Sequence, residues 1–424
     1  MNEKKMHPAD QVVETINRVY YAGLTTTSGG NISMMDEEGN IFITPSSIDK
    51  GTLTRRDIVK VTPSGEKIGL HKPSCELPFH SNVYKLRPDI KAIVHAHAPA
   101  VVAFALARQI PNIQITTHTK SLLSKISTSR YALPGSLKLG DIIKEEFAKG
   151  FDIVMMDAHG AVVGAKDLDT AFSLYESLDF CARMQINAQA IGCDLNGFTN
   201  QNTLAVPQLE TFESGTYSNE EIDFRNELCN ILARSYRLKI VNSTTGTFSR
   251  RLPSGGFLIT PYGKDRSCLK PEDIVKIENG RQEAGKTASR AVKLHEYIYR
   301  AHPEINSVFM AQPPHIMAFI LSEQELFNAR LIPESYIMLR EIKKIPFSAL
   351  QDYAVLSDAI TKETPIVMID GECALSTGKD IVQAFDRMEV LEYSADSVIS
   401  ALRLGSVGRI SDEEVTEIID HFIN

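Results

Sequence analysis

The sequence predicts an α/β protein built from two copies of one domain. Three observations carry this expectation. The chain has 424 residues, which is more than a single hydrophobic core usually organises. Short β-branched runs alternate with longer stretches of helical periodicity. A set of short segments then recurs in register in the second half of the chain.

The composition describes an ordinary globular chain. Hydrophobic residues make up 43% and charged residues 23% of the sequence, and the net charge is −8. This charge argues against the basic surfaces that bind nucleic acid or anionic membranes. No apolar segment reaches membrane-spanning length and residues 1–8 lack the apolar core of a secretion signal, so we expect a cytoplasmic protein. The six cysteines form no C-x-x-C pair and are expected to be reduced.

The first half alternates between the two kinds of element. Apolar residues at helical spacing indicate helices, whereas short β-branched runs bounded by turn residues indicate strands. The sequence predicts helices over residues 9–22, 77–86, 137–149 and 167–191, strands over 41–44 and 57–61, a strand running into His95, and a strand pair within 151–165.

The internal repeat keeps its register over long distances. Each half of the chain contains an Ile-Thr-Pro segment. The threonine of the second segment, Thr260, lies 216 residues after Thr44 of the first (260 − 44). The segment 273–276 follows its counterpart 57–60 by the same offset, and both read Asp-Ile-Val-Lys. Two matches in one register indicate a duplicated domain rather than chance similarity.

The sequence between the two copies has little periodicity and many polar or turn residues. Such a composition is typical of a linker. We therefore expect one domain over residues 1–196, a linker over 197–217 and a second domain over 218–424.

A pair of histidines ends one buried strand of the first copy. His95 and His97 are two residues apart, so an extended backbone places both on the same face. Pro99 fits the first turn of a following helix. This spacing lets two imidazole nitrogens reach one metal ion, although histidines with purely structural roles also occur at it.

The second copy lacks the polar residues that accompany these histidines in the first copy. Three histidines with an open coordination position form a catalytic metal site, so we expect His95, His97 and His159 to bind one metal ion. The alternative role for His159 is to cap a turn. The joint loss of all three histidines and of Glu76 indicates one shared site. The counterparts in the second copy are Met310 for His95, Gln312 for His97, Glu372 for His159 and Ala291 for Glu76.

Glu76 stands at the start of a helix just before the histidine strand. Desolvation beside a metal could set its pKa for proton abstraction, whereas a purely structural carboxylate there would interact with the helix dipole. Three small-residue loops could bind phosphate through amides and hydroxyls, although each could equally be a simple turn. These loops are Gly30–Asn31, Ser46–Ser47 and Ser74–Cys75.

In chain order these segments resemble the class II aldolase/adducin family, and within it the L-fuculose-1-phosphate aldolase type. The full motif set covers about residues 8–192, and the second half resembles the same fold with degraded motifs. The resemblance implies tandem three-layer α/β/α domains, each around a mostly antiparallel sheet. It rests on Ser28–Ser33, Thr44–Ser47, Glu76 with His80, His95–Pro99 and His159–Gly160.

The resemblance implies a zinc-dependent aldolase that cleaves a phosphorylated ketose into dihydroxyacetone phosphate and an aldehyde. Glu76 would be the acid/base and Tyr131 would protonate the aldehyde-side oxygen from a neighbouring subunit. We expect two tandem chains to form a pseudo-tetramer. The metal would be Zn²⁺ or another divalent ion on His95, His97 and His159, and the phosphate pocket would comprise Gly30, Asn31, Ser46, Ser47 and Ser74.

Other functions stay open at this point. A pentulose-phosphate 4-epimerase or a sugar-phosphate dehydratase could use the same site, but the related epimerases place aspartate where this chain has Glu76. A non-catalytic, adducin-like scaffold would need neither the metal nor the acid/base. These functions differ in their products, which are dihydroxyacetone phosphate, a diastereomer, water or none.

Overall fold

The computed structural model describes residues 6–323 and 327–423, which form two compact units. The first unit runs to Ile113 and resumes over His118–Ala182, and the second holds Gln114–Thr117 and the chain from Arg183 onward. Residues 1–5, part of the segment expected to lack a secretion signal, lie outside the described residues. The domain limits at 196 and 218 stay a prediction.

The first unit is built on an eight-stranded sheet with the order β4-β3-β2-β1-β5-β8-β7-β6. Neighbouring strands are antiparallel except for β6 and β7, which are parallel. This arrangement confirms the expected mostly antiparallel sheet. The strands are β1 (Asn31–Met35), β2 (Ile41–Ile43), β3 (Val59–Val61), β4 (Lys67–Ile68), β5 (Ala92–Ala96), β6 (Ile126–Ser129), β7 (Ile153–Met156) and β8 (Gly160–Ala165).

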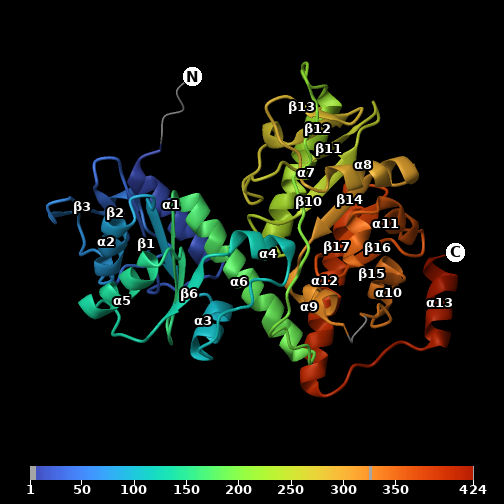
Figure 1. Ribbon diagram of the computed structural model, residues 1–424. Helices are drawn as coiled ribbons and strands as arrows, with labels where there is room; N and C mark the ends of the chain where they lie inside the picture. Colours follow the sequence, from blue (N-terminus) through green and yellow to red (C-terminus); the bar gives the residue numbers. More distant parts are fainter. Residues whose placement is uncertain (1–5, 324–326, 424) are drawn as a thin grey trace. The chain divides into compact units, whose positions relative to one another are not determined.

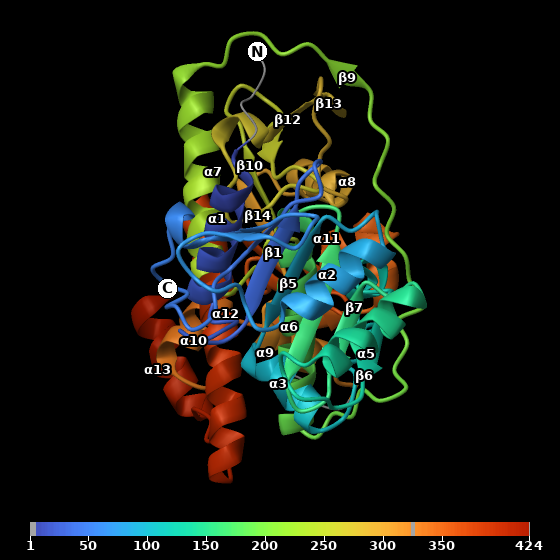
Figure 2. The same ribbon diagram turned by 90° about the vertical axis from the view of Figure 1, so that its left-hand side faces the viewer.

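Helices cover both faces of this sheet (Figure 1). One layer holds α2 and α5, whose apolar side chains share a core with the strands, and these two helices lie in front of the sheet in Figure 2. On the other face α1 contacts β1 and β2, and α3 contacts β7 and β8. The helices are α1 (Pro8–Tyr21), α2 (Leu77–Leu86), α3 (Pro99–Leu106), α4 (Thr117–Leu122), α5 (Leu137–Ala148) and α6 (Leu168–Ala190), with a 3-10 turn η1 (Arg55–Asp57).

The sheet of the second unit repeats this topology. Its order is β15-β16-β17-β14-β10-β11-β12-β13-β9, which matches the first sheet strand for strand and adds β9 at one edge. The strands are β9 (Thr211–Phe212), β10 (Thr247–Arg251), β11 (Phe257–Ile259), β12 (Val275–Glu278), β13 (Arg281–Glu283), β14 (Ser307–Ala311), β15 (Ile342–Ile345), β16 (Ile366–Ile369) and β17 (Cys373–Gly378).

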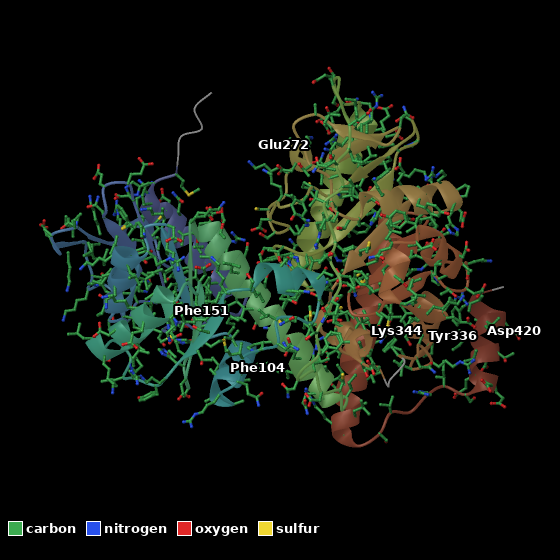
Figure 3. The ribbon with its side chains drawn as sticks, in the orientation of Figure 1. Phe104, Phe151, Glu272, Tyr336, Lys344 and Asp420 are labelled. Atoms are coloured by element: carbon green, nitrogen blue, oxygen red, sulfur yellow. The ribbon has the colours of Figure 1, made fainter. Side chains whose placement is uncertain are left out.

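The helices of the second unit again pack on both faces of the sheet. Side chains of α8 and α11 share a core with the strands, whereas α7 contacts β10, and α9 and α12 contact β17. In each unit side chains fill the space between sheet and helices (Figure 3). The elements are α7 (Asn219–Arg237), α8 (Val292–Ala301), α9 (Pro314–Leu321), α10 (Pro333–Leu339), α11 (Tyr353–Ala359), α12 (Ile381–Leu404) and α13 (Asp412–Phe422), with 3-10 turns η2 (Pro271–Asp273) and η3 (Phe347–Leu350).

The duplication extends to individual hydrogen bonds. In the first unit the Ser33 hydroxyl lies 2.7 Å from both His80 Nδ1 and the Tyr84 hydroxyl. The second unit repeats this buried triad with 2.6 Å for both contacts. Its members are Ser249, His295 and Tyr299. The repeat inferred from short sequence matches therefore describes a duplicated three-dimensional scaffold.

Some boundaries differ from those expected. Residues 55–57 form a 3-10 turn, because Asp57 accepts hydrogen bonds from the backbone and hydroxyl of Thr54, so the expected strand 57–61 begins at Val59. The expected linker contains the short strand β9, which pairs in parallel with β13. All six cysteines are free. None of the helices in the described part of the chain has the length and apolar character that a membrane crossing requires.

The buried Arg225 provides a test of the second unit's stability. Its guanidinium is fully buried and contacts Glu221 at 2.7 Å and Glu283 at 2.9 Å. Replacing one partner of a buried ion pair leaves uncompensated charge and costs about 3–5 kcal/mol. We expect Arg225→Met to lower the unfolding free energy of the second unit by this amount in urea titrations followed by circular dichroism.

The matched control is Arg234→Met on the same helix. Arg234 is half exposed and pairs with Glu389 at 3.1 Å. An exposed pair contributes about 0–1 kcal/mol, so this variant should unfold close to the wild-type midpoint. Equal effects of the two substitutions would show that the Arg225 cluster is not the stabilising feature described.

Candidate metal site and acid/base carboxylate

Four segments of the first unit converge at one end of its sheet. Asn31 begins β1 and lies directly opposite His95 of β5 in the antiparallel ladder. His97 follows β5 and His159 precedes β8, which is paired with β5. Glu76 occupies the position just before α2. Strand pairing thus brings the three predicted metal ligands together, and the start of α2 adds the predicted acid/base Glu76.

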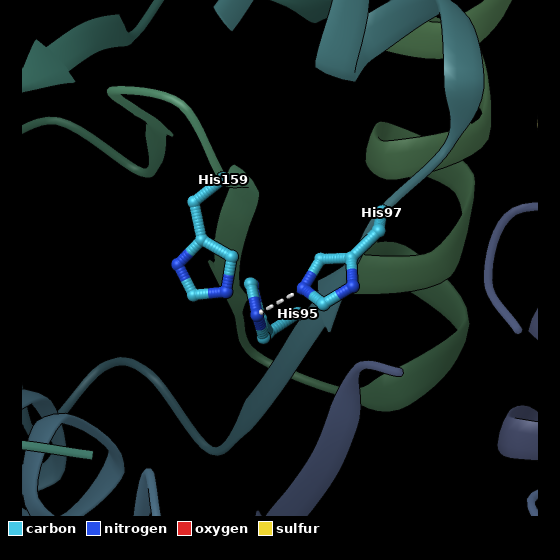
Figure 4. A group of neighbouring side chains, drawn as sticks. All are labelled: His95, His97 and His159. Atoms are coloured by element: carbon cyan, nitrogen blue, oxygen red, sulfur yellow. Dashed lines mark hydrogen bonds between the residues drawn. The ribbon is translucent and has the colours of Figure 1, made fainter. Parts of the chain in front are cut away.

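The three histidines form one compact cluster (Figure 4). The ligand atoms of His95, His97 and His159 all lie within 4.8 Å of one another. His95 is fully buried, and its Nδ1–H donates to the carbonyl of Ala161 at 2.9 Å. This bond leaves Nε2 as the nitrogen facing the cluster, 3.0 Å from Nε2 of His97.

The surroundings keep two of these rings neutral. Burial, together with the neighbouring His95, lowers the pKa of His97 to about 3 and that of His159 to about 4. Neutral imidazoles offer the lone pairs that a metal ion needs. In the described part of the chain this is the one group of His, Cys, Asp or Glu side chains with a suitable arrangement.

Glu76 lies against this cluster and is 5% exposed. Its Oε2 is 3.1 Å from His95 Nε2, and its Oε1 is 3.8 Å from His159 Nε2. Burial alone would raise the pKa of the Glu76 carboxyl, but His95, Asn31 and His159 outweigh burial and lower the pKa well below its usual range. Among the described residues Oε1 has no hydrogen-bond partner, so one carboxylate oxygen stays free to interact with a metal or a substrate proton.

A chain of hydrogen bonds behind Glu76 fixes its orientation. The Asn31 amide donates to Glu76 Oε2 at 2.7 Å, so Asn31 Oδ1 is left to accept from His80 Nε2–H at 2.5 Å. His80 Nδ1 is then left to accept from the Ser33 hydroxyl, which also lies 2.7 Å from the Tyr84 hydroxyl. The Tyr84 hydroxyl donates to the Ser33 carbonyl at 3.0 Å, so the chain of contacts is anchored on β1.

The donor set therefore fits a divalent metal ion. Three nitrogen donors face one point, the tautomer of His95 presents the correct nitrogen, and a buried carboxylate oxygen beside them lacks a partner. Three histidines with one open position are the arrangement of catalytic metal sites.

The expected phosphate loops lie next to this cluster in the fold. Loop 44–47 and loop 72–74 are joined by backbone bonds from Ser46 N to the Lys72 carbonyl and from Ser74 N to the Thr44 carbonyl. Ser46 is half-buried, Ser47 is exposed with φ 59°, and the Ser74 hydroxyl accepts from the Glu76 amide at 3.2 Å. Gly30, with φ +66°, passes so close to His95 that a Cβ would lie 2.7 Å from the His95 carbonyl oxygen.

Two features of this site were not foreseen from the sequence. Asn31 was expected to bind phosphate, but its side chain forms a hydrogen bond with Glu76. The second feature is Lys50, whose buried ammonium lies under the Ser46–Ser47 loop. Lys50 Nζ donates to the carbonyls of Pro45 and Ile48 at 2.9 and 3.2 Å. The sequence holds one indication that Lys50 has a role. Arg266 lies 216 residues after Lys50 (266 − 50), which is the offset of the repeat, so both copies have a basic residue at this position.

Tyr131 follows the edge strand β6, which β7 and β8 separate from the histidine strand β5. Its side chain is 58% exposed, two residues after the end of β6, and it is available to another molecule. Phe347 occupies the same place after β15 in the second unit and is 7% exposed. The role of Tyr131 at a neighbouring subunit's site stays a prediction.

Gly160 provides a test of the histidine geometry. A Cβ at this position would lie 2.4 Å from the Ala96 carbonyl oxygen and 2.9 Å from Cδ2 of His97. We expect Gly160→Ala to displace His97 and weaken metal affinity about tenfold or more, as measured by competition with a chromophoric chelator.

Gly215→Ala is the matched control, because a Cβ at Gly215 meets no atom within 4 Å. The control should bind metal as the wild type does. Wild-type affinity of the Gly160 variant would show that close packing of Ala96 and His97 is not required for the site.

Comparison with known proteins agrees with this geometry. The "Class II Aldolase and Adducin N-terminal domain" family model matches residues 10–186 and again 226–399. The chain is 30% identical to 5-deoxy-D-ribulose 1-phosphate aldolase of Bacillus thuringiensis over 186 residues, which cover 43% of this chain and 86% of the relative. It is 33% identical to L-fuculose phosphate aldolase of Methanococcus maripaludis over 170 residues, 40% of this chain and 88% of the relative. It is 31% identical to 3-oxo-tetronate 4-phosphate decarboxylase of Pectobacterium atrosepticum over 169 residues, 39% of this chain and 77% of the relative. The chain therefore belongs to the class II aldolase and adducin family, whose domain it contains twice.

Proposed function

We propose that the first unit is a zinc-dependent aldolase that cleaves a phosphorylated ketose into dihydroxyacetone phosphate and an aldehyde. The observation that carries this proposal is the buried Glu76 carboxylate, which has one unbonded oxygen beside three convergent histidines. The two aldolase relatives, both named for sugar phosphates, support the substrate class.

The metal would be held by His95, His97 and His159. A zinc ion there would supply Lewis acidity to the carbonyl group of the substrate. Imidazole donors favour zinc but also accept other divalent ions. The protein's own contribution is to fix the three rings, most clearly through the bond from His95 Nδ1 to the Ala161 carbonyl.

Glu76 would act as the acid/base group. In the cleavage direction the bond between the two substrate carbons breaks, and its electrons stay with the fragment that becomes dihydroxyacetone phosphate. Glu76 Oε1 would exchange the proton at that carbon, while Asn31 holds Oε2 through a 2.7 Å hydrogen bond. An acid/base group fixed in this way contributes roughly 10²- to 10⁴-fold to a rate.

The phosphate of the substrate would bind at the loops that carry Gly30, Asn31, Ser46, Ser47 and Ser74. Loop amides and hydroxyls are suited to an anion, and the buried Lys50 ammonium adds positive charge beneath them. This position would direct the carbonyl end of the ketose toward the histidines.

We further propose that two chains assemble as a pseudo-tetramer of four domains and work in the cytoplasm. The exposed Tyr131 would then exchange a proton with the aldehyde-side oxygen in a site of the partner chain: this oxygen gives up its hydroxyl proton in cleavage and regains it in the reverse direction. An exposed phenol with no role in its own unit supports such a contact.

A second candidate reaction is decarboxylation of a 3-oxo acid phosphate. It is supported by the 31% identity to the 3-oxo-tetronate 4-phosphate decarboxylase over 169 residues. Loss of carbon dioxide from such an acid leaves the same kind of electron-rich carbon as aldol cleavage does. The two reactions differ in their second product, which is an aldehyde for cleavage and carbon dioxide for decarboxylation.

The Glu76→Gln variant tests the proposed acid/base role. We expect kcat for release of dihydroxyacetone phosphate from ketose 1-phosphates to fall about 10²- to 10⁴-fold, because the amide cannot exchange the proton. Release is measured by coupling to an NADH-dependent reductase, and metal content should stay at the wild-type level.

Glu66→Gln is the control, because Glu66 is exposed in the β3–β4 turn and should leave kcat unchanged. An unchanged kcat in Glu76→Gln would contradict the acid/base assignment. Carbon dioxide release without dihydroxyacetone phosphate would favour the second candidate, and absence of turnover and of bound metal would favour a scaffold.

A further inference from the structure

A short segment of the first copy belongs to the second unit. Residues Gln114–Thr117 follow α3 in the sequence and end at the first residue of α4, yet they group with the second unit, whereas the chain on either side of them groups with the first. A connection between two helices usually runs over the surface. Here Ile115, Thr116 and Thr117 are 0%, 0% and 5% exposed. The polar groups of this buried segment therefore need partners within the fold.

Glu372 provides the partner for Thr117. Its carboxylate accepts from the Thr117 amide at 3.2 Å and from the Thr117 hydroxyl at 2.8 Å. Glu372 is 5% exposed, and in the described part of the chain both hydrogen bonds of its carboxylate come from Thr117. Burial raises the pKa of Glu372, although the two bonds from Thr117 and the charge of Arg290 act in the opposite direction. The buried carboxylate and the buried segment therefore depend on one another.

The backbone turn that carries Glu372 is the same turn that carries His159 in the first unit. The amide of each residue donates to the carbonyl three residues earlier, at 3.0 Å for Glu372 and 3.1 Å for His159. The preceding residue has a left-handed backbone in both copies, with φ 66° at Gly371 and φ 53° at Ala158. The side chain that leaves this turn is thus an imidazole in one copy and a carboxylate in the other. A carboxylate accepts N–H and O–H bonds, so the exchange suits this position to peptide groups instead of a metal.

Two carboxamide side chains support this arrangement. Gln312, which stands where the first unit has a histidine, donates through Nε2 to the Glu372 carbonyl at 2.6 Å. Asn200, from the expected linker, donates through Nδ2 to the Gly371 carbonyl at 2.9 Å. The Asn200 amide also donates to the Gln114 carbonyl at 2.9 Å. Asn200 therefore bonds both to the turn and to the segment.

We infer that the second unit uses this turn as a docking site for residues 114–117 of its own chain. Glu372 is the receptor group for Thr117, Asn200 joins the segment to the turn, and the buried Ile115 is the apolar part of the segment. The second copy thus keeps the turn of the metal site and binds a peptide segment with it. The inference goes beyond the proposed catalysis and does not depend on it, because it involves no reaction and no metal.

Hydrogen–deuterium exchange of the full chain, followed by mass spectrometry, tests the docking site. We expect Glu372→Ala to speed exchange in peptides that span residues 114–118 about 10- to 100-fold, because the Thr117 amide loses a charged acceptor. Exchange over β16 and β17 should change much less, since the hydrogen bonds between these strands are untouched. Glu363→Ala is the matched control, because Glu363 is exposed, and it should leave exchange at 114–118 unchanged.

Two conservative variants separate docking from the general stability of the second unit. Glu372→Gln retains one acceptor oxygen and should give a smaller increase at residues 114–118. Thr117→Val keeps the amide and removes the hydroxyl. The effects of these two variants on the logarithm of the exchange rate should not be additive, because the two residues share the 2.8 Å bond.

Three results would overturn the inference. They are unchanged exchange at 114–118 in Glu372→Ala, an equal increase throughout the second unit, and full additivity of the two conservative variants. Because no activity is measured, failure here leaves the proposed aldolase function untouched, and failure of the aldolase assay leaves the docking site untouched.

Discussion

The contact between the buried Glu76 carboxylate and His95 organises the first unit's site. Its 3.1 Å distance holds a negative charge beside a fully buried imidazole, and neither group could be left alone at that depth. The hydrogen-bond chain from Tyr84 through Ser33, His80 and Asn31 keeps the carboxylate in place. A second bond, from His95 to the Ala161 carbonyl, orients the ring and thereby fixes which nitrogen faces the other histidines.

The two units share some buried polar side chains and differ in others. The serine–histidine–tyrosine triad is kept in both copies with contacts of 2.6–2.7 Å, because it packs the helix before the central strand onto the sheet. The groups beyond the triad differ: Asn31 and Glu76 give way to Thr247 and Ala291. The scaffold has therefore been retained, while the histidine cluster and its neighbouring carboxylate are present in one copy and absent from the corresponding positions of the other.

Much of the fold could be predicted from the sequence, because its signals are local. The alternation of β-branched runs with helical periodicity gave the order of elements, and the repeat at a fixed offset gave the second copy. The ends of the helices and strands were harder to predict. Asp57 caps a 3-10 turn instead of beginning a strand, and β9 forms only because β13 lies beside it. Such pairings depend on residues far away in the sequence.

Some residues of the candidate site could likewise be predicted from the sequence, and others could not. His95, His97, His159 and Glu76 could be found because their loss in the second copy marks them as one group. The role of Asn31 could not be read from its loop, since it depends on His80 and Glu76 reaching it from another helix. Lys50 was missed because a lone lysine in a loop is usually solvated, and only the fold buries it at 2% exposure.

Elemental analysis of freshly purified protein, expressed as metal ions per chain, tests whether one unit binds a metal ion and its twin does not. We expect about one zinc per chain, as three histidines in one unit require. Two metal ions per chain, or none even after addition of Zn²⁺, would contradict this expectation.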